Sequence, residues 1–229
     1  MNDIVKLKHA IKAICIPFVV LIIEFILIYF ICLLQTDSKT QDQIIYGICP
    51  IIIIILILYF KHLKIKKIPQ YTELLTPFFI GVCLNGIVYC IVYLLKAIPA
   101  LTDFVNNNIS TNEYYNGIYF FILFPTVIFI TPIKEELIYR YLIGNELLNF
   151  NSKVTIIGTS LIFAFAHSVH LIENTATQAA SMQIQIINFI YSFILGLFLC
   201  KYYIEKDLYH SIVFHIGFNL SGLLFYTLF

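Results

Sequence analysis

Two adjacent carboxylates, Glu135 and Glu136, and the chain's one arginine, Arg140, stand at the end of a run otherwise made of Ile, Phe and Tyr. An ionised side chain at membrane depth costs at least about 2.5 kcal/mol, so it is by default a candidate functional group with a partner elsewhere. Glu136 and Arg140 are spaced i, i+4 with the carboxylate first, which favours an ion pair within one helix. Glu135 is turned about 100° away and is left to face another element.

Polar side chains that could meet Glu135 occur in two later apolar runs, at His167 and at His215 and Asn219. Glu135 and His167 lie equally far along the chain from Asn151, in a short turn, so an antiparallel helical hairpin puts them at one depth. His215 and Asn219 share one face of the last run, and Asn219 is expected close to that depth. A carboxylate beside imidazoles can activate water, and imidazole and carboxamide N–H groups can stabilise an oxyanion.

The elements that must position these residues are membrane helices. The 229 residues are 60% hydrophobic and 12% charged, whereas soluble domains carry about 25% charged residues. The apolar runs reach the roughly 20 residues that cross a bilayer as helix. We therefore expect an all-α, polytopic helical membrane protein, with residues 1–229 forming a single integral membrane domain. About seven transmembrane helices are expected, near 13–34, 44–60, 74–98, 117–148, 153–172, 184–204 and 208–229.

The distribution of charge predicts orientation and partners. With the N-terminus in the cytoplasm, all of the 14 basic residues except Lys39 and Lys96 fall at the inner side, as the positive-inside rule requires. The connections 99–116 and 172–183 lack Lys and Arg and are expected outside. A net charge of +1 offers no basic face for nucleic acid, so the lipid bilayer is the expected partner. Glu24 stands alone in the first span, where a structural partner or a snorkelling position is expected.

Three motifs in order carry a family resemblance. Glu135-Glu136-x-x-x-Arg140, Phe163-x-x-x-His167 and His215-x-x-x-Asn219 resemble the signatures of the CAAX prenyl protease and bacteriocin-processing (CPBP, or Abi) intramembrane proteases. The type II CAAX prenyl endopeptidase is a relative in this family. The motifs cover residues 131–219. Residues 1–116 are therefore interpreted as N-terminal spans without a signature, and 117–229 as the catalytic core.

The resemblance implies a conical core around the motif-bearing helices and a role for each matched residue. Four residues would be catalytic: Glu135, His167, His215 and Asn219. Three would support the site structurally: Glu136, Arg140 and Phe163. Glu135 with His167 would activate water for attack on a peptide carbonyl, and His215 with Asn219 would stabilise the oxyanion. The implied activity is that of an intramembrane endopeptidase acting on a peptide or membrane-anchored precursor.

Several alternatives stay open. Glu135, His167 and His215 could ligate zinc with one open position, but the resemblance favours glutamate-activated water and no bound metal. A non-catalytic bacteriocin self-immunity or membrane scaffold protein of the same fold is the second functional hypothesis.

The Lys- and Ile-rich composition suggests an AT-rich bacterial genome, so the bacterial cytoplasmic membrane is the expected location and a prenylated substrate is not expected. The sequence indicates no oligomeric state.

Overall fold

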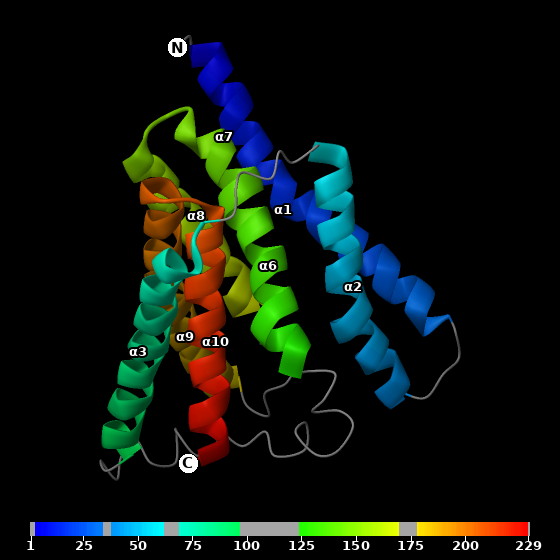
Figure 1. Ribbon diagram of the computed structural model, residues 1–229. Helices are drawn as coiled ribbons and strands as arrows, with labels where there is room; N and C mark the ends of the chain where they lie inside the picture. The colour runs from blue at the N-terminus through cyan, green and yellow to red at the C-terminus, as the bar shows by residue number, and fades with distance from the viewer. Residues whose placement is uncertain (1–2, 34–37, 62–68, 97–123, 170–177, 229) are drawn as a thin grey trace.

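The computed structural model describes residues 3–33, 38–61, 69–96, 124–169 and 178–228 (Figure 1). These residues form long helices joined by short turns, and none of them lies in a strand. The predicted all-α class is therefore confirmed. The connection 99–116, the first half of the connection 172–183 and the start of the fourth expected span, 117–123, lie outside the described residues, and α9 already begins at Gln178.

Six helices are regular: α1 (Asp3–Cys32), α2 (Ser38–Lys61), α3 (Tyr71–Lys96), α8 (Ser152–Val169), α9 (Gln178–Glu205) and α10 (Leu208–Leu228). Between α3 and α8 runs one continuous rod, residues 124–148, which we call the motif helix because it carries the two glutamates. It consists of η1 (Thr126–Ile130), α6 (Thr131–Glu136), η2 (Leu137–Gly144) and α7 (Asn145–Leu148). These seven rods correspond in order to the seven expected spans.

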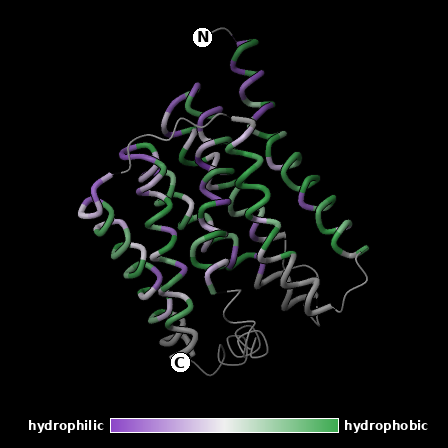
Figure 2. The backbone as a smooth tube through the Cα atoms, turned by 45° about the vertical axis from the view of Figure 1, so that its right-hand side comes forward, coloured by the Kyte–Doolittle hydropathy of each residue, from purple (hydrophilic) through white to green (hydrophobic). Residues whose placement is uncertain are grey.

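The helices have the composition of membrane spans. Three contain segments long and apolar enough to cross a bilayer, within α1, α3 and α9, and shorter apolar segments cover Gly47–Tyr59 and Leu208–Leu224. Hydrophobic residues run along most of the helical length, with hydrophilic residues at the N-terminal end of α1 (Figure 2). Helix α1 begins ten residues before the expected span. No Pro or Gly interrupts residues 3–12, and His9 in that extension bonds Glu146 of α7.

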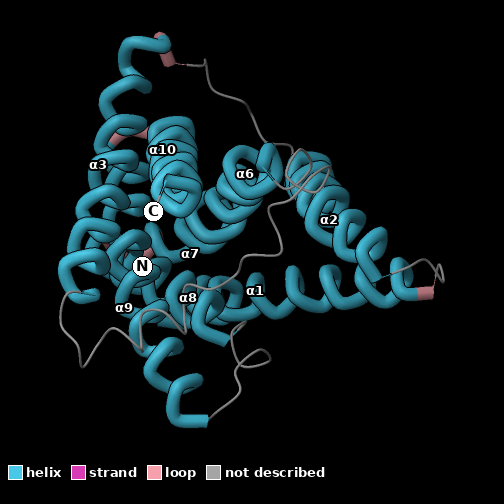
Figure 3. Tube along the Cα trace, turned by 90° about the horizontal axis from the view of Figure 1, so that it is seen from below, coloured by secondary structure: helices cyan, strands magenta, loops and turns pink. Residues whose placement is uncertain are grey.

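The motif helix is the element shared by two apolar cores. Helices α1 and α2 pack on one side of it, and α10 with its neighbours α3, α8 and α9 lies on the other (Figure 3). The first core joins α1 and α2 to the motif helix through Ala13, Ile53, Ile57, Leu137, Ile138, Ile143 and Leu147. The second joins α8, α9 and α10 through Phe163, Leu195, Leu199, Phe214 and Phe218, and Tyr139 of the motif helix packs against both cores. The motif helix is thereby held from both sides.

Helices α3 and α10 approach closely because glycines remove side chains at their contact. A Cβ atom added at Gly81 would lie 2.2 Å from the Phe214 carbonyl oxygen, and one at Gly217 would lie 2.3 Å from the Phe78 carbonyl oxygen. Small residues commonly allow backbones to approach in membrane helices, where packing rather than hydrophobic burial drives association. This contact fixes the position of α10, which carries His215.

Both ends of α6 are bordered by π-helical turns, η1 before it and η2 after it. Pro132 stands at the second position of α6. A proline cannot donate a backbone hydrogen bond, and its ring clashes with the carbonyl four residues earlier. The wider i→i+5 turn of η1 accommodates that position, and π-turns of this kind are frequent at functional sites.

Candidate active site

A tight hairpin places the motif helix against α8. Helix α7 ends at Leu148 and α8 begins at Ser152. The Val154 N–H donates to Asn151 Oδ1 over 2.8 Å, which caps the first turn of α8. The predicted antiparallel hairpin is thus present, and it brings His167 to the level of Glu135.

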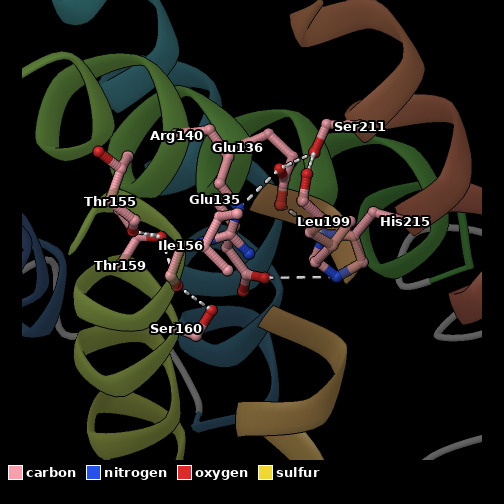
Figure 4. A network of polar contacts seen from close by, with 10 residues as sticks. All are labelled: Glu135, Glu136, Arg140, Thr155, Ile156, Thr159, Ser160, Leu199, Ser211 and His215. Atoms are coloured by element: carbon pink, nitrogen blue, oxygen red, sulfur yellow. Dashed lines mark hydrogen bonds and ion pairs between the residues drawn. The ribbon is translucent and has the colours of Figure 1, made fainter. Parts of the chain in front are cut away.

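Glu135 lies between two histidines from different helices. Its Oε1 is 3.6 Å from His167 Nε2, and its Oε2 is 3.6 Å from His215 Nε2. Both separations are slightly longer than a direct hydrogen bond. Figure 4 shows Glu135 pointing toward His215 across the gap between the motif helix and α10. The expected meeting of Glu135, His167 and His215 at one depth is confirmed.

The imidazole of His167 is held by its own helix. His167 Nδ1 lies 2.9 Å from the Phe163 carbonyl oxygen. A carbonyl only accepts, so the proton of this bond is on Nδ1, and Nε2 is the nitrogen that faces Glu135. The Phe163 ring packs against the imidazole with centroids 4.1 Å apart. The expected contact between Phe163 and His167 is therefore present.

Glu136 and Arg140 form the ion pair that their spacing predicts. Arg140 Nε lies 3.2 Å from Glu136 Oε2, and both side chains are completely buried. The Arg140 guanidinium carbon lies 4.9 Å from the centre of the Phe163 ring, within the range of a cation–π contact. The stability of a buried ion pair depends on both partners, because removing one of them leaves an uncompensated buried charge.

The structure adds two contacts to Glu136 that the sequence did not predict. Its Oε1 lies 3.1 Å from His215 Nδ1, and the Ser211 hydroxyl donates to its Oε2. Ser211 Oγ also lies 2.9 Å from the Leu199 carbonyl oxygen of α9. Ser211 stands one turn before His215 on α10, and that i, i+4 spacing was the signal available in the sequence. Glu136 thus contacts Nδ1 of the His215 ring, whereas Nε2 of the same ring faces Glu135 (Figure 4).

Asn219 makes a contact different from the expected one. Its Nδ2 donates to the Val127 carbonyl oxygen in η1 over 2.9 Å, two turns before Glu135 on the motif helix. His215, rather than Asn219, stands level with Glu135. The expectation needs the turn before α10 to lie level with the turn at Asn151. The contacts of Ser211 with Glu136 and of His215 with Glu135 show that α10 begins further along the motif helix, so Asn219 reaches Val127.

Glu24 has a partner immediately beside the motif. Lys134 Nζ lies 2.9 Å from Glu24 Oε1, and the two side chains are 18% and 22% exposed. The expected structural partner of Glu24 is therefore Lys134. Lys134 and Arg140 are two of the basic residues expected at the cytoplasmic side. In the structure each is paired with a glutamate, Lys134 with Glu24 of α1 and Arg140 with Glu136 of its own helix.

A metal centre was weighed for Glu135, His167 and His215. Within the described ranges, no group of three or more His, Cys, Asp or Glu side chains is arranged to hold a metal ion. No step of the reaction proposed below is assigned to a metal.

Comparison with known proteins agrees with the geometry. Residues 117–221 match the family model described as type II CAAX prenyl endopeptidase Rce1-like. No curated protein and no solved structure shows significant similarity to the chain. The matched segment contains Glu135, His167, His215 and Asn219. This match confirms the resemblance to the CPBP family over residues 117–221, and the matched family is of intramembrane protease type.

Proposed function

We propose that this protein is an intramembrane endopeptidase that hydrolyses a peptide bond in a peptide or membrane-anchored precursor. The observation that carries the proposal is the position of Glu135, whose two carboxylate oxygens each lie 3.6 Å from an imidazole nitrogen of a different helix. The Glu135 side chain is 14% exposed and that of His167 is 35% exposed. Water and substrate can therefore reach this pair from one side.

Glu135 and His167 are the proposed proton acceptors. The carboxylate of Glu135 takes a proton from a water molecule. With Nδ1–H held by the Phe163 carbonyl, a neutral His167 presents the lone pair of Nε2 to the same place. General-base assistance of this kind typically contributes 10²- to 10⁴-fold in rate. The His167 ring is fixed before substrate binds, which lowers the cost of reaching the reactive geometry.

The proposed reaction consumes one water molecule. As Glu135 takes the proton, the water oxygen bonds to the carbonyl carbon, and the carbonyl electron pair moves to its oxygen. Collapse of this tetrahedral intermediate breaks the carbon–nitrogen bond. The leaving nitrogen takes the proton from Glu135, directly or through His167, so the products are a carboxylic acid and an amine.

His215 and Asn219 are the proposed donors to the oxyanion. Because Glu136 accepts from His215 Nδ1, a donor role for His215 must use Nε2, and the ring then carries a proton on each nitrogen. The Asn219 carboxamide has two N–H donors, of which Val127 engages one. Removing one oxyanion donor costs about 10²- to 10³-fold in catalytic rate in well-studied hydrolases.

The proposed setting is a bacterial cytoplasmic membrane with the N-terminus in the cytoplasm. Lys6, Lys8 and Lys12 precede the apolar part of α1. Lys153 stands in the first turn of α8 and Lys206 in the turn after α9, which places both at the same end of the bundle. Such a bias favours the cytoplasmic side for that end.

The decisive experiment is mass spectrometry of candidate peptides incubated with purified protein and with its Glu135→Gln variant. Cleavage by the wild-type protein and loss of at least about 10²-fold in Glu135→Gln is expected. Glu205→Gln is the matched control, because Glu205 is 59% exposed at the end of α9. Full biological activity of folded Glu135→Gln, His167→Ala and His215→Ala would instead favour the immunity or scaffold hypothesis.

Metal dependence needs its own measurement. Activity that persists after chelator washing, with no stoichiometric metal in the active protein, is expected. Stoichiometric zinc that is lost together with activity would overturn the metal-free reaction.

A further inference from the structure

The turn before Pro132 leaves one backbone carbonyl without a donor from its own helix. In η1, the Thr131 N–H donates to the Thr126 carbonyl oxygen, five residues back. The next carbonyl, that of Val127, would take its π-helical bond from residue 132. Residue 132 is proline and has no N–H. The α-helical donor to Val127 would be Thr131, which is already engaged.

This carbonyl is satisfied from another helix. Asn219 Nδ2 of α10 donates to the Val127 oxygen over 2.9 Å. Because a carbonyl only accepts, this bond determines which end of the Asn219 carboxamide faces the motif helix. Val127 is 45% exposed at the surface of the bundle, and within a membrane such a surface faces lipid, which has no donor to offer. An unsatisfied carbonyl at this place would destabilise the fold.

We propose that Pro132 is a positioning residue for Asn219. By withholding a backbone donor, Pro132 keeps the Val127 oxygen available, and that oxygen holds the Asn219 carboxamide with its second N–H free for substrate. The catalytic part of this inference rests on the proposed function. Its structural part, the dependence of the Asn219–Val127 bond on the proline, does not.

A double-mutant cycle in thermal stability tests the structural part without any substrate. In the natural background, Asn219→Ala leaves the Val127 oxygen unsatisfied and should lower the melting temperature by about 5 °C. In the Pro132→Ala background, the new N–H of residue 132 can donate to the Val127 oxygen. Asn219→Ala should then lower the melting temperature by less than half as much as it does in the natural background. Equal drops in both backgrounds would overturn the proposal.

Ser221→Ala is the matched control. Ser221 also stands on α10 and donates from Oγ to a carbonyl of another helix, that of Val82 on α3, over 3.0 Å. Its effect should be the same in the natural and the Pro132→Ala backgrounds, because the two sites share no partner. If Pro132→Ala does not yield folded protein, Pro132→Gly restores the N–H at the same place, and the cycle is measured in that background.

Kinetics test the catalytic part. Pro132→Ala should lower kcat about tenfold with little change in KM when Asn219 is present, and should have no further effect on kcat in Asn219→Ala. A general structural defect would lower kcat equally in both backgrounds, and that result would overturn the positioning role. If no peptide is cleaved by the natural chain, the proposed function fails, while the stability cycle still decides the dependence of the Asn219 bond on Pro132.

Discussion

His215 Nδ1 lies 3.1 Å from Glu136 Oε1, on the side of the ring opposite to Glu135. Glu136 is therefore more than the ion-pair partner of Arg140. A buried carboxylate that accepts from one imidazole nitrogen fixes the orientation of the ring and determines what its other nitrogen can do. The two neighbouring glutamates thus act on opposite nitrogens of one histidine.

Ser211 should matter for the orientation of His215. Ser211→Ala removes the hydroxyl that donates to Glu136 and should lower kcat about fivefold to tenfold while costing about 1 kcal/mol of stability. The control is Ser168→Ala, because Ser168 Oγ donates to the Ala164 carbonyl within its own helix. Peptide cleavage kinetics and thermal unfolding measure both. Equal kcat values for the two variants would contradict a role of Ser211 in the site.

The glycines between α3 and α10 should tolerate no side chain. Gly81→Ala and Gly217→Ala place a Cβ within 2.2 and 2.3 Å of backbone carbonyl oxygens, so the helices must separate, at a cost of about 3 kcal/mol or more. Gly144→Ala is the control, because its nearest neighbour would lie 3.5 Å away. It should be neutral or stabilising, since Ala favours helix over Gly. Thermal unfolding in detergent measures the stability of the three variants. A loss of stability in Gly144→Ala as large as in Gly81→Ala and Gly217→Ala would show that the close approach of α3 and α10 is not the cause.

The Glu24–Lys134 pair should be exchangeable. Lys134→Glu places two carboxylates together beside Glu135 and should cost about 2 kcal/mol of stability together with most of the activity. The double exchange Glu24→Lys with Lys134→Glu should restore most of the stability, because the pair is rebuilt in reverse. The exposed pair of Lys201 and Glu205 serves as control, where Lys201→Glu should change stability by less than about 0.5 kcal/mol. Additive losses in the double exchange would rule out direct coupling.

Asp207 should contribute a pH-dependent cap to α10. Although burial opposes ionisation of Asp207, hydrogen bonds from the His210 side chain and backbone outweigh it and hold the pKa of Asp207 below its ordinary value of 3.8. A lowered acid pKa stabilises the fold above the unfolded value and is lost as pH falls through the folded value. This pH-dependent contribution should be complete above pH 3.8 and be lost as the pH falls below it.

Asp207→Asn separates this titration from the cap itself, because asparagine still offers a side-chain oxygen to the first turn. The natural protein should lose stability more steeply than Asp207→Asn as the pH is lowered below 3.8. Thermal unfolding at a series of pH values measures the difference. Parallel pH profiles for the two proteins would show that Asp207 does not carry the dependence.

The sequence by itself determined the helices, the meeting of Glu135 with His167 and the pairing of Glu136 with Arg140. Hydropathy locates each span because about 20 apolar residues are needed to cross a bilayer, and the short turn at Asn151 sets Glu135 against His167. The Glu136–Arg140 pair also follows from spacing alone, because residues four apart share a helical face. These features depend on local periodicity and chain direction.

Only the tertiary structure decided which atoms of these residues touch. The contacts of His215 with both glutamates, of Lys134 with Glu24 and of Asn219 with Val127 each join segments far apart in the chain. They depend on which helices are neighbours, on how closely Gly81 and Gly217 let α3 and α10 approach, and on the π-turn before Pro132. The spacing of residues in the sequence predicts which side chains share one face of a helix. It does not predict which other helix packs against that face, or at what register the two helices meet.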